Sequence, residues 1–153
     1  RALYPPFWES VSPRMTPVPI HLGDPAEPVT RLSSQDWYMP SGNPPWNFGS
    51  IGNLPRVTGP WMVDVRRAGR YRVTLRQWPE VADRAIVANT AKLEMAGMSW
   101  ERPVADGATG VPFEIELPAG PTTLTTRLTD ESGASGGAYF TDVVFQTGVD
   151  AEE

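Results

Sequence analysis

The sequence predicts an all-β protein: an antiparallel β-sandwich, jelly-roll-like, with an extended proline-rich N-terminal arm. Short segments in which apolar and polar residues alternate recur along the chain, and no stretch of ten or more residues keeps a helical period. Turn-forming residues, among them 17 prolines and 14 glycines, separate these segments. A chain of 153 residues with 40% hydrophobic residues is long enough for one domain with a buried core.

The beginning of the chain differs from the rest because prolines are concentrated there. We expect residues 1–16 to form an extended linker or arm, and residues 17–153 to form the sandwich. Within 17–22 (PVPIHL), prolines alternate with apolar residues. Since proline is tolerated at the edge of a sheet, this segment predicts an edge strand.

The next alternating segment covers residues 61–77. Trp61, Val63 and Val65 alternate with Met62, Asp64 and Arg66, and Ala68-Gly69 then forms a turn. The following residues alternate again, with arginines on one face. Two alternating runs joined by a short turn are typical of a β-hairpin, so we predict a hairpin over 61–77.

Later segments follow the same pattern. Residues 91–95 and 98–102 are expected to be strands joined at Ala96-Gly97, and further strands are expected at 111–117, around Leu124–Leu128 and at 138–147. The apolar side chains on the inward face of each strand should fill the space between the two sheets. The predicted core residues are Tyr71, Val73, Leu75, Leu93, Val111, Phe113, Ile115, Leu124, Leu128 and Val144.

Residues 33–51, SSQDWYMPSGNPPWNFGSI, fit neither a strand nor a helix, yet they contain four aromatic residues. We expect Trp37 to anchor this segment on the core. Trp46 lies between Pro45 and Asn47, and the sequence does not decide whether its ring is buried or exposed. Exposed indole rings stack on sugars or fill pockets of protein partners. Trp46, Asn47 and Tyr38 are therefore candidate ligand or domain-interface residues.

A second candidate surface is a stripe of arginines. Arg70, Arg72 and Arg76 share one face of the predicted strand, and Trp78 ends it. Guanidinium groups bind sulfate through charge-assisted hydrogen bonds, so this stripe is a candidate site for a sulfated carbohydrate. The alternative is a solvated face on which the arginines pair with Asp64 or Glu114.

Composition argues against several classes of function. The net charge of −5 argues against generic binding of nucleic acid or of an anionic membrane, and no apolar run approaches the length of a membrane span. There are no cysteines, and His21 is the only histidine, so neither a nucleophilic triad nor a thiolate or paired-histidine metal site can be assembled. Glu114 and Glu116 look like solubilising charges, with a glycosidase pair as the alternative. We assign no catalytic residue, metal ligand or cofactor to this chain.

The order of several motifs carries a family resemblance. PVPIHLGDPAEPV is followed by LSSQDWYMPSGNPPWNFGSI, GPWMVDVRRAGRYRVTLRQWP, FEIELPAGPTTLTT and GGAYFTDVVF. In this order they resemble the C-terminal accessory region of bacterial arylsulfatase-type enzymes, over roughly residues 8–145. The segment that ends in Arg76-Gln77-Trp78-Pro79 is the most specific part.

The resemblance implies that the chain is non-catalytic. The nucleophile of that family is a formylglycine made in a Cys/Ser-x-Pro-x-Arg motif, which this sequence lacks, and the calcium site of the family lies in its catalytic domain. The implied partner is a sulfatase catalytic domain of the same polypeptide, on which this chain would pack and whose substrate cleft its loops would help to form. The arm, residues 1–16, would then come from that missing N-terminal catalytic domain, and the implied location is periplasmic or secreted. Two alternatives remain: an independent carbohydrate-binding module for sulfated polysaccharide, and a purely structural sandwich.

Overall fold

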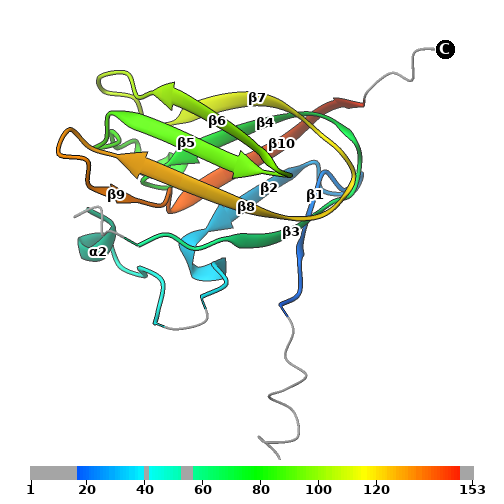
Figure 1. Cartoon of the computed structure of the whole chain (residues 1–153), viewed down its shortest axis with the longest axis horizontal. Helices are drawn as coiled ribbons and strands as arrows, with labels where there is room; N and C mark the ends of the chain where they lie inside the picture. The colour runs from blue at the N-terminus through cyan, green and yellow to red at the C-terminus, as the bar shows by residue number, and fades with distance from the viewer. Residues whose placement is uncertain (1–16, 40–41, 53–56, 149–153) are drawn as a thin grey trace, which may run out of the picture.

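The computed structural model describes residues 17–39, 42–52 and 57–148, and in it two β-sheets pack face to face (Figure 1). The first sheet has the order β1-β3-β8-β5-β6, with β9 beside β8, and the second has the order β2-β10-β4-β7. The predicted jelly-roll-like β-sandwich is confirmed. The strands are β1 (Ile20–Leu22), β2 (Val29–Ser33), β3 (Trp61–Val65), β4 (Gly69–Arg76), β5 (Thr90–Met95), β6 (Met98–Pro103), β7 (Val111–Leu117), β8 (Gly120–Thr129), β9 (Ser135–Gly136) and β10 (Phe140–Gly148).

Helical structure is sparse in the part of the chain that the structure describes. It consists of the short helix α2 (Phe48–Gly52) and the 3₁₀ turns Ser34–Asp36 and Glu80–Ala82. None of these helices has the length and apolar character needed to cross a membrane. The predicted arm, residues 1–16, lies outside the described residues.

The hairpin predicted over 61–77 is wrong. β3 pairs with β1 and β8 in one sheet, whereas β4 pairs with β10 and β7 in the other. The connection between them is a corner that carries the chain across the sandwich. It is held by hydrogen bonds from the Arg66 amide to the Leu22 carbonyl (2.9 Å) and from the Tyr71 hydroxyl to the Arg67 carbonyl (2.6 Å).

The β5–β6 hairpin and the edge strand near the start of the sandwich were also predicted. The hairpin over β5 and β6 is confirmed, and its turn places Ala96 and Gly97 at φ values of 52° and 74°. The edge strand within 17–22 is confirmed as β1, but it pairs with β3 in parallel, so the sheets are not purely antiparallel.

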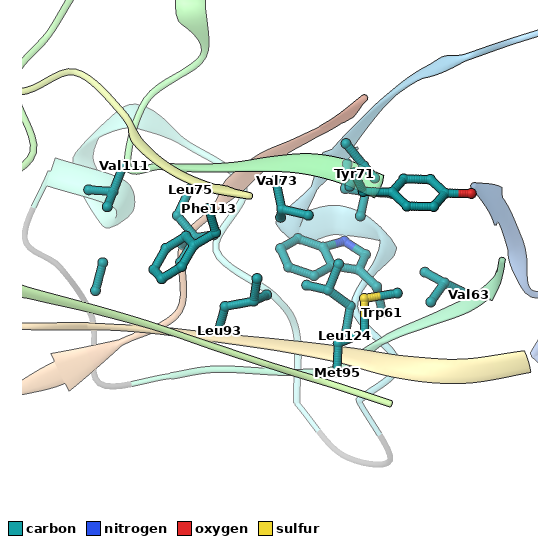
Figure 2. Close-up of a cluster of buried hydrophobic side chains, with 14 of the residues drawn as sticks. Trp61, Val63, Tyr71, Val73, Leu75, Leu93, Met95, Val111, Phe113 and Leu124 are labelled. Atoms are coloured by element: carbon teal, nitrogen blue, oxygen red, sulfur yellow. The ribbon is translucent and has the colours of Figure 1, made fainter. Parts of the chain in front are cut away.

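The core lies between the two sheets, where side chains of β4 and β7 meet those of β3, β5 and β8 (Figure 2). Nine of the ten predicted core residues are buried, because the period of two in each strand sets which face it turns inward. Val144 is the exception. Its neighbour Val143 is buried instead, opposite Val73 of β4, and Val144 lies on the outer face.

Candidate functional site

The irregular segment after β2 is anchored on the core by Trp37, as predicted. Its ring is buried and lies 5.7 Å from the ring of Trp61 and 5.8 Å from that of Tyr139. The amide of Ser34 donates to the Tyr139 carbonyl (2.7 Å), and the indole Nε1 of Trp61 donates to the Ser33 carbonyl (2.7 Å). The start of the segment is therefore part of the sandwich.

The end of the same segment presents aromatic rings to solvent. Trp46 is 71% exposed and Phe48 is 65% exposed, and both line one small pocket of about 100 Å³. We call Trp46 and Phe48 the aromatic platform. The other residues that line its pocket are Ser33, Ser34, Gln35, Pro45, Ile51, Pro79 and Phe140. The lining of this pocket thus combines polar residues with aromatic and other apolar ones.

Three hydrogen-bonding side chains hold the platform in place. Ser34, itself buried, donates from Oγ to the Pro45 carbonyl (2.9 Å). Asn47 accepts a hydrogen bond from the Ser50 amide (2.8 Å) and so caps the start of α2. Gln77 is fully buried; its Nε2 donates to the Ile51 carbonyl (3.0 Å) and its Oε1 accepts from the Val87 amide (2.8 Å). These bonds fix the backbone that carries both rings.

Trp78 does not lie on an exposed stripe with the arginines. It is only 7% exposed, because Phe48 stacks on its ring at 5.9 Å and the Arg84 guanidinium lies 4.5 Å above the ring centre. β4 ends at Arg76, and the alternation that would point Trp78 outward ends with it. Trp78 therefore supports Phe48 from below.

Two other candidates lie apart from these surfaces. Tyr38 is 47% exposed, but it does not line the platform pocket, and its amide donates to the Pro60 carbonyl (2.8 Å). Arg70 is exposed on β4 opposite Glu116 of β7. Neither side chain is brought together with the aromatic platform.

Arg72 and Arg76 point outward from β4, and each meets a carboxylate. Nε of Arg72 lies 2.6 Å from Oε1 of Glu114, one of the pairings expected from the sequence. Arg66 takes the other expected acceptor, Asp64, at 3.0 Å. Nε of Arg76 lies 2.9 Å from Oδ2 of Asp142, a pairing that the sequence did not indicate because Asp142 follows Arg76 by 66 residues.

The two arginines also line a groove, which we call the arginine groove. It measures about 570 Å³ and is open to solvent. Its lining is Arg72, Thr74, Arg76, Arg102, Thr109, Gly110, Pro112 and Glu114. Three elements contribute to it, namely β4, the start of β7, and the end of β6 with the connection that follows.

Among residues 17–39, 42–52 and 57–148, no group of three His, Asp or Glu side chains is placed to hold a metal ion. His21 is exposed on β1, opposite Asp64. Glu114 and Glu116 alternate with buried residues on β7, as expected for an outer face.

Sequence reasoning missed Phe48, Gln77 and Arg102. Phe48 follows Trp46 by two residues in the same loop, and this spacing was an available signal. Gln77 directly follows β4 and continues the series of inward-facing positions Tyr71, Val73 and Leu75. A polar side chain at such a buried position needs hydrogen-bond partners. Arg102 had no signal, because its place in the groove depends on the contact between two sheets.

The fold and these surfaces define a two-sheet β-sandwich with a fixed, loop-borne aromatic platform at one end. No protein-family model matches the chain, and no curated protein sequence matches it either. Solved structures similar to it include a ruminal GH26 endo-beta-1,4-mannanase, at 15% identity and a TM-score of 0.49, over 79% of this chain and 26% of that one. Another is CBM35 from Cellvibrio japonicus Abf62, at 18% identity and a TM-score of 0.42, over 59% of this chain and 67% of that one.

Proposed function

We propose that this chain is a non-catalytic carbohydrate-binding β-sandwich and that the aromatic platform holds the glycan. The observation that carries the proposal is the exposure of Trp46 and Phe48 beside one pocket. Large aromatic side chains are seldom left this exposed, and an indole face complements the apolar C–H face of a sugar ring.

The rest of the pocket suits the hydroxyl groups of a sugar. Ser33 and Gln35 bring side-chain donors and acceptors to its wall. The platform is also held before any ligand arrives, because Ser34, Asn47 and Gln77 bond to its backbone. A surface that is ordered in advance loses less conformational entropy on binding.

The test is affinity electrophoresis of the chain against a panel of soluble plant and algal polysaccharides. We expect retardation by at least one member of the panel and its loss in Trp46→Ala/Phe48→Ala. The control is Met98→Ala, which removes an exposed apolar side chain at the β5–β6 turn. Retardation that persists in the double variant, or no retardation by any member, contradicts the proposal.

A second candidate is the role implied by the sulfatase resemblance, an accessory domain that packs on a catalytic domain of a longer, exported polypeptide. The same platform favours it, because an exposed aromatic pair is also what a partner domain covers. The coding sequence that precedes Arg1 tests this directly: a Cys/Ser-x-Pro-x-Arg motif there supports it. A different upstream domain removes the sulfatase from consideration and leaves the glycan-binding proposal intact.

A further inference from the structure

The arginine groove lies where the edges of the two sheets come together. β6 is the edge strand of one sheet and β7 is the edge strand of the other. Nη1 of Arg102, at the end of β6, donates to the Pro112 carbonyl near the start of β7. This bond ties the two edges together and places the Arg102 guanidinium in the wall of the groove.

Arg72 and Arg102 each make one hydrogen bond to the described part of the chain and keep further donors. A guanidinium group carries five N–H donors in a fixed plane. Arg72 uses Nε toward Glu114, and its side chain remains 54% exposed. Arg102 uses Nη1 toward Pro112 and is exposed as well. Both groups are thus positioned by the protein, with donors left for an anion in the groove.

Arg76 plays a different part. Its side chain is only 14% exposed, and its three nitrogens are directed to Asp142 (2.9 Å), to Glu80 (3.5 Å) and to the Thr109 carbonyl (3.4 Å). A Cβ atom at Gly110 would lie 3.0 Å from Nη1 of Arg76. Arg76 therefore forms a wall packed closely against the connection between β6 and β7, and it is not an open cation.

The charge of the lining is unusual for this protein. The whole chain has a net charge of −5, yet three arginines and one glutamate line the groove. Asp142 and Glu80, the carboxylates paired with Arg76, do not line it. Thr74 and Thr109 add to its wall. Arginine forks and neutral polar groups are a lining that suits an oxyanion.

The groove and the aromatic platform border on one another. Phe140 lines the pocket of the platform, and in the register of β10 with β4 it lies opposite Arg76, which lines the groove. Figure 1 shows α2 and the connection from β6 to β7 at the same end of the sandwich. Arg72 lies four residues from Arg76, or about 13 Å along a strand. One extended ligand can therefore reach both surfaces.

We propose that the arginine groove binds an oxyanion (a carboxylate, sulfate or phosphate group) through Arg72 and Arg102. We further propose that this group belongs to an acidic polysaccharide whose sugar rings lie on the aromatic platform. The second statement rests on the proposed function, whereas the first depends on the groove alone. The preferred glycan is then acidic and not neutral.

The oxyanion site is tested on the whole chain by NMR of the arginine Nε–Hε groups. Sodium sulfate, sodium phosphate and sodium acetate are titrated separately, each against sodium chloride at equal ionic strength. We expect saturable shifts at Arg72 and Arg102 with at least one of the three anions, and none at Arg70, which is exposed on the same strand outside the groove. Shifts matched by chloride, or equal shifts at Arg70, overturn the site.

The polysaccharide is tested by affinity electrophoresis with carboxylated, sulfated and neutral glycans. Arg72→Gln/Arg102→Gln should weaken binding of the acidic glycan about tenfold or more, with neutral glycans unaffected. Arg70→Gln/Arg127→Gln removes the same charge elsewhere and should change binding much less. Trp46→Ala/Phe48→Ala should weaken acidic and neutral glycans alike.

The outcomes separate the two proposals. Saturable anion shifts without any glycan binding leave the oxyanion site standing and overturn the proposed function. Glycan binding that is lost in the platform variant but unchanged in Arg72→Gln/Arg102→Gln overturns the link between the groove and the polysaccharide. Equal weakening by both arginine pairs also overturns it, because attraction by net charge then accounts for the effect.

Discussion

Trp37 and Trp46 stand in one irregular segment, yet one is 5% exposed and the other 71%. Both have a polar or proline-rich neighbourhood in the sequence, so local composition does not separate them. The difference lies in what each ring meets. The Trp37 ring packs on Trp61 of β3 and on Tyr139, just before β10, and the missing Cβ atoms of Gly59 and Gly137 leave it space. Trp46 lies beyond the edge of the core.

The two halves of this loop are held in different ways. Its first half is joined to the sandwich by rings and backbone bonds, so it belongs to the core. Its second half is carried by a few side-chain bonds from Ser34 and Gln77 to loop carbonyls. An exposed aromatic surface can therefore be held rigidly without being buried.

The largest expected effect tests this contrast directly. Trp37→Ala should destabilise the chain by about 3–5 kcal/mol, the usual cost of truncating a buried tryptophan. Trp46→Ala should change stability by no more than about 0.5 kcal/mol, because its ring is exposed. Equilibrium urea unfolding measures both, and similar losses for the two variants would break the comparison.

A methyl group at position 137 should clash with the Trp37 ring, which anchors the first half of the segment. A Cβ atom at Gly137 would lie 2.5 Å from Cζ2 of Trp37, whose ring is buried. We expect Gly137→Ala to cost about 1–3 kcal/mol, as overpacked cores do. Gly52→Ala in α2 is the matched control, because there the added atom makes an ordinary 3.4 Å contact with Trp78. Thermal unfolding of the pair should separate the two.

Loss of the buried Gln77 side-chain amide should make the second half of the segment, which carries the aromatic platform, less rigid. Gln77→Leu leaves the Ile51 carbonyl and the Val87 amide without their partner, which should cost about 1–3 kcal/mol. Faster hydrogen exchange at the amide of Val87, together with weaker glycan binding, is the expected signature. Gln146→Leu, at an exposed position of β10, should show neither effect.

The smallest expected effect concerns the exposed arginine pair. Arg72 and Glu114 are both about half exposed, so a double-mutant cycle with Arg72→Gln and Glu114→Gln should give a coupling energy below about 1 kcal/mol. Arg76 and Asp142 have side chains exposed by only 14% and 16%, and the same cycle there should give a larger value. An equal coupling for both pairs contradicts the role of burial in this contrast.

The periodic part of the fold could be predicted from the sequence. In β4 and β7 the apolar residues recur at every second position, with polar residues or Pro112 between them, so only one face of each strand can turn inward. The β5–β6 hairpin was predictable too, since its turn is two residues long with Gly97 at positive φ. Trp37 was also assigned correctly to the core.

The errors have a common physical origin. Alternation identifies a strand but not its partner, so β3 and β4 were paired although the corner at Arg66–Arg67 sends them to different sheets. At Val143 and Val144, two adjacent apolar residues leave the inward face undetermined. Arg102 joins the groove through a contact between sheets, which no local pattern records.

The way the chain alternates between the sheets bears on how fast the protein folds. Among the described residues, β2 pairs with β10 alone, so the strand that leads into the aromatic segment can pair only after the last described strand has been made. Pairings between residues far apart in sequence slow folding, because the chain must close long loops before it gains contacts. During synthesis, Tyr139 and β10 emerge after the other described strands, and until then Ser34 lacks its Tyr139 acceptor and Trp37 can pack only on Trp61. The loop that carries the aromatic platform is therefore expected to be among the last parts of the domain to become ordered.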